Sequence, residues 1–274
     1  MRLSDCSVLL TGASGGIGAA TARALVAAGA RVLLVARDGR RLAQLADTLA
    51  ASAREGQVAA FATDLATPTG RAQLRDLAIA RRVNVLVNNA GTPCFGTLAE
   101  TDDARIAEVI GTNLVAPVAL TRALLPHLSA QPCAAILNVG STLGRLGLPG
   151  FSVYAAGKFG LRGFSEALRR ELGGSAVAVL YLAPRATKTP FNDARVAAFN
   201  RATGTREDPP EAVAAAIVRM IERGTHERQL GFPERFAVRL NGLAPRWLDG
   251  AFAKHRAELA RPAATPHLPE EIAR

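Results

Sequence analysis

The chain has 274 residues, of which 49% are hydrophobic and 20% are charged, and its formal net charge is +10. This composition is typical of a globular protein and excludes a coiled coil and a disordered chain. A net positive charge favours binding to nucleic acid, to phosphates or to an anionic membrane. The sequence has no basic run with interleaved aromatic residues, so we expect solvated arginines and no nucleic-acid partner.

The cysteines and the apolar runs bear on localisation. Cys6, Cys94 and Cys133 match no metal-ligand or redox spacing, which predicts no metal site, a reducing compartment and cysteines used as small apolar fillers. The first apolar run begins so early that it leaves no room for a signal peptide. No apolar stretch approaches the about 18 residues that span a bilayer, so we expect a cytoplasmic protein.

Short apolar runs alternate along the chain with longer amphipathic ones. Patterns of strands buried on both faces lie at 6–11, 31–36, 57–62, 83–87, 134–140 and 176–182. Helical patterns lie between them at 16–28, 39–53, 69–81, 101–110, 113–130 and 153–172, followed by a helix at 210–223, a strand near 228–231 and a helical tail from 234. The alternation predicts an α/β fold, with one doubly wound parallel sheet flanked by helices. We assign residues 1–231 to one domain and 232–274 to a C-terminal extension.

A glycine-rich stretch, TGASGGIG at residues 11–18, separates the first strand from the first helix. Gly12, Gly16 and Gly18 permit a tight turn, and at this point of a doubly wound sheet such a turn holds a dinucleotide pyrophosphate at the helix N-terminus. A turn without a ligand is the alternative, which the position between strand and helix disfavours. We therefore expect cofactor contacts from the three glycines, Ser14 and Ile17.

The glycine spacing resembles the TGxxxGxG pattern of the classical short-chain dehydrogenase/reductase family. Further matches follow in chain order: Asn88-Asn89-Ala90-Gly91 is similar to the family's NNAG motif, and Asn113, Ser141, Tyr154 and Lys158 match its catalytic set. The resemblance covers about residues 6–190. It implies a Rossmann-type sheet, a nicotinamide cofactor and oxidoreductase activity.

Tyr154 and Lys158 are spaced one helical turn apart and share a face. A free tyrosine has a pKa near ~10, and a nearby ammonium lowers it, so that Tyr154 can exchange a proton with a carbonyl or alcohol oxygen. Ser141, just after the fifth strand, can hydrogen-bond the same oxygen. The resemblance implies that Asn113 anchors a relay water and that Lys158 also binds the nicotinamide ribose.

The end of the second strand bears on cofactor choice. The family's NAD-binding members carry an acidic residue where this chain has Ala36, and Arg37 follows at once. A guanidinium can bind a 2′-phosphate through paired hydrogen bonds, so we expect NADP(H). The alternative is a surface Arg37 with Asp38 on the ribose. The resemblance implies that Asp64 and Leu65 contact the adenine, and that Asn88, Ala90 and Gly91 line the adenosine.

After the sixth strand the family usually has P-G-x-x-x-T, and this chain has PRATKT at 184–189. Pro184, Thr187 and Thr189 are expected near the cofactor, with Thr189 on the nicotinamide amide or the diphosphate. Arg185 replaces the glycine, and it either contacts an anionic substrate group or changes the turn. With Arg145 and Lys188 it makes an acidic substrate plausible, such as a phosphopantetheine or coenzyme A thioester. Residues 185–206 form the expected substrate lid.

The C-terminal extension carries an apolar stripe at helical spacing: Phe232, Phe236, Leu240, Leu243 and Trp247. Pro245 should kink or restart the helix. The favoured interpretation is that the stripe packs on the domain, covers the pocket or joins a subunit. The alternative is that residues 232–259 lie on an anionic membrane, on its inner face, because arginines occupy the other sides of the helix.

These observations predict an NADP(H)-dependent oxidoreductase that interconverts a ketone or aldehyde and an alcohol, mainly by reduction. A membrane-surface reductase of lipid or sterol ketones and a non-catalytic NADP-binding regulator are the alternatives. The resemblance implies a homodimer or homotetramer formed through 113–130 and 153–172.

Overall fold

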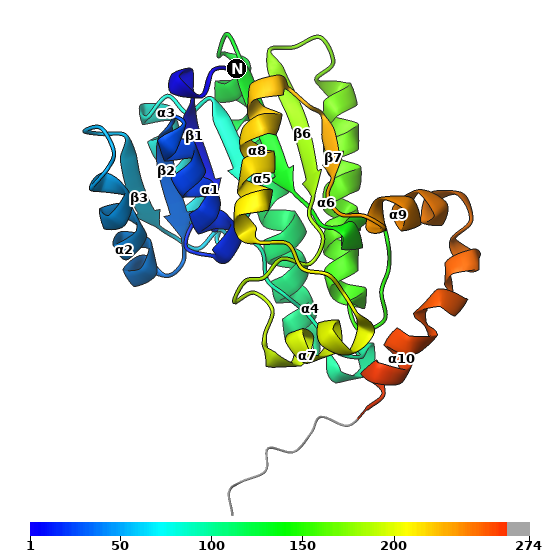
Figure 1. Ribbon diagram of the computed structural model, residues 1–274. Coiled ribbons are helices and arrows are strands. Elements are labelled where there is room, and N and C mark those ends of the chain that lie inside the picture. Colours follow the sequence, from blue (N-terminus) through cyan, green and yellow to red (C-terminus); the bar gives the residue numbers. More distant parts are fainter. Residues whose placement is uncertain (262–274) are drawn as a thin grey trace, which may run out of the picture.

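The computed structural model describes residues 1–261, so the end of the predicted extension, at 262–274, lies outside the described residues. Seven strands form one parallel sheet in the order β3-β2-β1-β4-β5-β6-β7 (Figure 1). The strands are β1 (Ser7–Thr11), β2 (Arg31–Ala36), β3 (Val58–Ala62), β4 (Val85–Asn88), β5 (Ala134–Val139), β6 (Val177–Ala183) and β7 (Glu227–Gln229). The predicted α/β fold with a doubly wound sheet is confirmed.

Helices cover both faces of this sheet (Figure 1). One face carries α1 (Gly16–Ala27), α2 (Gly39–Ala50) and α8 (Pro210–Arg223), and the other carries α3 (Pro68–Ala80), α5 (Ala116–Ser129) and α6 (Ser152–Glu171). Alternate residues of each strand serve the two layers, as expected for a pleated strand: Val8 and Leu10 join the first core, and Leu9 joins the second.

The strand order reverses between β1 and β4, which are paired through Val8 and Val85. In doubly wound sheets, ligands bind outside the carboxyl ends of the strands at such a switch point. The glycine-rich turn after β1 and the motif Asn88–Gly91 after β4 therefore meet there.

The predicted helices at 101–110 and 113–130 form one continuous helical segment. A π-helical turn, η3 (Gly111–Val115), joins α4 (Asp103–Ile110) to α5. The joined segment Asp103–Ser129 contains a window of mean hydropathy 1.4 and is long and apolar enough to cross a membrane. The prediction that no stretch approaches that length is thus corrected, because the turn does not break the helix. Leu120, Leu124 and Leu128 of this segment are buried against the sheet, as in a core helix.

Two local predictions from the sequence were incomplete. Within the expected lid, residues Ala194–Thr203 form α7, whose first turn is capped by the Asp193 side chain accepting a hydrogen bond from the Val196 amide at 2.8 Å. Only Val196, Phe199 and Asn200 of this helix are buried, so the sequence of α7 carries no sustained apolar stripe that would predict a helix. Cys133 is exposed rather than an apolar filler, whereas Cys6 and Cys94 are buried.

The C-terminal region is helical, as predicted. Helix α9 (Glu234–Leu243) leads through two short turns, η5 (Pro245–Leu248) and η6 (Gly250–Phe252), into α10 (Ala253–Leu259). Pro245 begins η5, so the helix is interrupted where a proline cannot continue it. In Figure 1, α9 stands at the side of the sheet, and the chain then descends to α10 beside α7.

Candidate active site

A cleft of about 1020 Å³ lies at the carboxyl edge of the sheet. It is lined by every residue that the sequence predicts for the cofactor, together with Ser141, Tyr154 and Lys158. Asn113 does not line it. The walls are completed by the lid, by the first part of α9 and by α10.

The glycine-rich turn is shaped by close backbone approaches. Gly12 has a φ of +65°, and a Cβ there would lie 2.8 Å from the Ala90 Cα. A Cβ on Gly18 would collide with the Gly12 carbonyl oxygen. Gly15 precedes α1 and provides no side-chain cap, so the first amides of the helix face the cleft and suit a pyrophosphate.

The segment after β4 is held from within the fold. Thr11 Oγ1 accepts hydrogen bonds from the backbone amides of Asn89, at 2.9 Å, and Ala90, at 3.0 Å. The Asn88 side chain is buried and donates to Asn138 Oδ1 at 2.8 Å. Asn88 thus ties β4 to β5 with its side chain while it borders the expected adenosine site.

Arg37 and Asp38 both border the cleft at the end of β2. Asp38 caps α2 by accepting from the Arg41 amide at 3.0 Å, and it also pairs with the Arg41 guanidinium at 3.4 Å. Arg37 is exposed and has no ion pair within residues 1–261. The guanidinium of Arg37 is therefore free for a ligand, whereas the Asp38 carboxylate is engaged.

Asp64 and Leu65 follow β3 and also border the cleft. The Asp64 side chain accepts a hydrogen bond from the Ala66 amide at 2.9 Å, and Arg71 donates to the Leu65 carbonyl at 2.7 Å. These bonds fix the turn and leave Asp64 exposed at its surface.

Tyr154 and Lys158 lie on α6, and Ser141 follows β5. The Lys158 Nζ donates to the Val139 carbonyl at 3.0 Å and lies 5.7 Å from the centroid of the Tyr154 ring. Burial lowers the pKa of Lys158 to about 8. Burial also raises the pKa of Tyr154 well above its usual value, against the opposing effect of its hydrogen bond with Ser141.

The expectation that Lys158 lowers the pKa of Tyr154 is therefore not met in this structure. The ammonium is directed to the Val139 carbonyl, and desolvation is the larger influence on the phenol. Tyr154 remains protonated at neutral pH, which is the form that a proton donor requires.

Asn113 lies behind the cleft, within the π-helical turn. Its side chain is buried, accepts from the Thr92 amide at 2.8 Å and donates to the Thr92 carbonyl at 2.9 Å. A Cβ on Gly91 would lie 3.2 Å from Asn113 Oδ1 and 3.8 Å from Lys158 Nζ. The fold therefore brings Gly91, Asn113 and Lys158 together, although the Asn113 side chain is already satisfied.

The segment 184–189 connects the cleft to distant parts of the chain. Thr142 donates to the Pro184 carbonyl through both its amide, at 2.8 Å, and its hydroxyl, at 3.2 Å. Thr187 pairs with Asp208 in an isolated bridge. Thr189 packs on Gly16, where a Cβ would collide with it. Thr189 thus abuts the expected pyrophosphate site.

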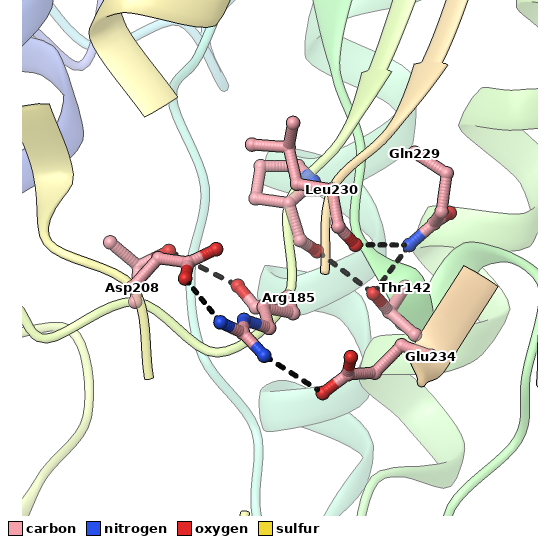
Figure 2. A network of polar contacts seen from close by, with 8 residues as sticks. Thr142, Arg185, Asp208, Gln229, Leu230 and Glu234 are labelled. Carbon is pink, nitrogen blue, oxygen red and sulfur yellow. Dashed lines mark hydrogen bonds and ion pairs between the residues drawn. The ribbon is translucent and has the colours of Figure 1, made fainter. Parts of the chain in front are cut away.

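Arg185 does not project freely at the mouth of the site. Its guanidinium contacts Asp208 at 2.6 Å and Glu234 at 3.5 Å, as Figure 2 shows. All three side chains are about four-fifths buried. Arg145 is likewise paired, with Glu227. Of the three cations that made an anionic substrate plausible, only Lys188 has no carboxylate partner among residues 1–261.

A group of aromatic rings extends from Tyr154 toward α10. Phe151 lies 6.5 Å from the Tyr154 ring and 6.1 Å from Phe199, and Phe199 lies 5.7 Å from His255. Phe191 lies 6.1 Å from Tyr154 on another side. All of these residues line the cleft. The part of the cleft beside Tyr154 is therefore suited to an apolar ligand.

We call Phe151, Phe191, Phe199 and His255, which lie beside Tyr154 in the cleft, the aromatic chamber. Sequence reasoning missed it. Phe191 and Phe199 lie in the lid and His255 in the extension, and no local spacing links them to Tyr154. The one available signal was the position of Phe151, three residues before the tyrosine expected to be catalytic.

Comparisons with known proteins agree with this geometry. A family model described as short chain dehydrogenase matches residues 7–199. The ketoacyl reductase HetN of Nostoc sp. is 36% identical over 229 residues, which cover 82% of this chain and 78% of that protein. The granaticin polyketide synthase putative ketoacyl reductase 1 of Streptomyces violaceoruber is 37% identical over 190 residues, covering 67% and 68%.

Among solved structures, a short-chain dehydrogenase/reductase from Burkholderia phymatum in complex with NAD superposes with a TM-score of 0.82. It is 25% identical, and the match covers 90% of this chain and 96% of that one. The family model matches more than half of the chain, and the glycine-rich turn and the Tyr154/Lys158 pair agree with that match. The chain therefore belongs to the short-chain dehydrogenase/reductase family of oxidoreductases.

Proposed function

We propose that this protein is an NADP(H)-dependent carbonyl reductase that converts a ketone or aldehyde to an alcohol. The observation that carries the proposal is a single cleft lined by the glycine-rich turn, Arg37 and the side chains of Ser141, Tyr154 and Lys158. A dinucleotide site and a proton donor are thus adjacent, as hydride transfer with protonation requires.

When bound, a nicotinamide would supply the hydride for the carbonyl carbon. The Tyr154 hydroxyl gives its proton to the carbonyl oxygen, and Ser141 holds that oxygen in place. Lys158 would bind the nicotinamide ribose, while its influence on the pKa of Tyr154 stays below that of desolvation. The Asn113 side chain is occupied by Thr92, so a relay water would be bound through its main chain in the π-helical turn.

The preference for NADP(H) is supported by the charges at the end of β2. Arg37 has no ion pair within residues 1–261, and the Asp38 carboxylate caps α2. A 2′-phosphate would receive charge-assisted hydrogen bonds from Arg37. Reduction is the proposed direction because cells hold NADPH mostly in its reduced form.

The substrate we propose is a ketone on an apolar acyl chain, such as a β-ketoacyl thioester. The aromatic chamber beside Tyr154 suits the chain, and two relatives bear the name ketoacyl reductase. A direct contact between Arg185 and an anionic substrate is not part of this proposal, because Asp208 and Glu234 neutralise the guanidinium.

The test is consumption of NADPH by the purified protein against a panel of carbonyl compounds that includes a β-ketoacyl thioester, with NADH in parallel. Replacing Tyr154 with Phe should lower kcat by about a thousandfold while NADPH binding persists, because only the proton donor is lost. Absence of turnover in the wild type with intact NADPH binding would instead identify a non-catalytic NADP-binding regulator.

A second candidate, reduction of lipid or sterol ketones at a membrane surface, is favoured by the exposed aromatic residues of the extension. The same panel distinguishes the two, because this candidate predicts turnover of apolar ketones without turnover of the thioester.

Assembly and location complete the proposal. We infer a cytoplasmic homodimer or homotetramer formed through α5 and α6. Its support is that Val115, beside α5, and Phe159, on α6, are exposed large hydrophobic residues on these elements.

A further inference from the structure

Helix α9 presents an apolar outer face to solvent. Phe236 and Leu243 are seven residues apart, two helical turns, so they share one side of the helix. They are 66% and 86% exposed, and Phe232 before the helix and Trp247 after it are 75% and 77% exposed. Large apolar residues that are exposed within one short segment of the chain mark an interaction site. We call these four residues the α9 surface.

The opposite face of α9 is the one that packs on the domain. Val238 is buried, Ala237 lines the active-site cleft, and Asn241 donates to the Arg145 carbonyl at 2.8 Å. Glu234 on this inner face joins Arg185, as drawn in Figure 2. Because these contacts anchor the helix, the α9 surface cannot turn inward without breaking them.

Arginines border the α9 surface. Arg239 lies three residues after Phe236 and four before Leu243, so it shares their side of the helix. Arg235 is adjacent, and neither arginine has a carboxylate partner among residues 1–261. The cationic region continues beyond α9, since partial burial and the charges of Arg219, Arg223 and Arg235 lower the pKa of Arg228.

We propose that the α9 surface docks the protein on an anionic lipid bilayer, with Phe232, Phe236, Leu243 and Trp247 entering the interface and Arg235 and Arg239 meeting lipid phosphates. Tryptophan and phenylalanine flanked by arginine have the composition of an interfacial helix face. A net charge of +10 adds attraction to such a membrane.

A second copy of the chain fits this surface less well. A two-fold interface places the same patch against itself and so brings Arg235 and Arg239 of both copies into one interface, where their like charges repel. An anionic bilayer provides the opposite charge together with an apolar layer. Docking also places the cleft, whose wall α9 forms, next to the lipid.

The chain contains a built-in probe, because Trp247 is its only tryptophan. The full-length protein is mixed with vesicles of phosphatidylcholine alone or of phosphatidylcholine with phosphatidylglycerol, and Trp247 emission and co-sedimentation are recorded. We expect a shift of emission to shorter wavelength and co-sedimentation with the anionic vesicles only, both weakened by added salt.

Two double variants separate the apolar and charged contributions. Phe236→Ser with Leu243→Ser, and Arg235→Gln with Arg239→Gln, should each lower vesicle affinity by at least about tenfold. Their matched controls are Ile79→Ser, an exposed apolar residue on α3, and Arg23→Gln with Arg169→Gln, which removes the same charge elsewhere. The controls should bind as the wild type does.

Three results would overturn the proposal: no vesicle binding by the wild type, unchanged binding by both double variants, or equal loss in the controls. A wild-type oligomer that dissociates in the apolar variant without any vesicle binding would assign the surface to a second copy. Vesicle binding needs no turnover, so its outcome is independent of the proposed reductase activity. Circular dichroism of each variant verifies that it is folded.

Discussion

Lys158 is a buried residue of the candidate active site, and desolvation lowers its pKa from the ordinary 10.5 to about 8. Between these two values the unfolded chain binds one proton more than the native protein at this residue. The free energy of unfolding therefore rises with pH across this window, and below it the buried charge is a cost to stability.

Replacing Lys158 with Met removes this dependence. We expect the unfolding free energy of the wild type, relative to Lys158→Met, to increase by up to about 3 kcal/mol from about pH 7 to about pH 10. Urea unfolding of both proteins at the two pH values measures it, and other titrating groups cancel in the difference. A difference that does not change with pH would show that Lys158 keeps its ordinary pKa.

Arg37 is the residue on which the proposed preference for NADP(H) depends. Arg37→Ala should raise KM for NADPH at least about tenfold and leave KM for NADH nearly unchanged, because only the 2′-phosphate loses its charge-assisted hydrogen bonds. Steady-state kinetics with both cofactors measure the effect, with Arg40→Ala as the control, since Arg40 is exposed and does not line the cleft. Equal loss with both cofactors would contradict a role in phosphate recognition.

For single residues, the sequence predicted the position correctly wherever the residue belongs to a local motif. The residues of TGASGGIG other than Ala13 line the cleft, as do Tyr154 and Lys158, because strand and helix geometry places them there. The direction of the pKa shift of Tyr154 differed from expectation, since desolvation depends on the packed surroundings and not on the spacing of Tyr154 and Lys158.

Among the elements, α9 and the lid are joined through Arg185. Its guanidinium contacts Asp208, which follows α7, and Glu234, which begins α9. Removal of the cation leaves two largely buried carboxylates close together, which is costly. The position that carries glycine in most of the family thus serves here to hold the lid and the extension against each other.

Arg185→Met should lower the free energy of unfolding by about 1–3 kcal/mol and raise KM for the ketone, with little change in KM for NADPH. Urea unfolding and steady-state kinetics measure the two effects. Arg75→Met, which breaks the exposed pair with Asp76, is the control and should cost less than about 1 kcal/mol. An unaltered KM for the ketone would restrict Arg185 to a role in stability.

The whole molecule is predicted to assemble through α5 and α6. Glutamate at both Val115 and Phe159 would place charges in that interface, and sedimentation velocity should then show a monomer where the wild type is a dimer or tetramer. Ile79→Glu is the matched control, because Ile79 is also an exposed apolar residue but lies on α3. An unchanged sedimentation coefficient in the double variant would assign the interface to another surface.

The sequence by itself determined the order of strands and helices, the single sheet and the motifs at its carboxyl edge. These follow from short-range causes: strands buried on both faces form apolar runs, and glycines mark turns that tolerate no side chain. Gly12 and Ala90 follow the paired strands β1 and β4, and the register of these two strands brings them together.

Only the tertiary structure decided which side of α9 packs, what Arg185 contacts and where His255 lies. The apolar stripe favoured a contact of Phe236 and Leu243 with the domain, the pocket or a subunit, yet within this chain Val238, Asn241 and Glu234 make the inner contacts. Periodicity reveals that a helix has two faces, but the choice between them depends on partners far away in the chain. For α9 those partners are Arg145 and Arg185, which no local pattern connects to it.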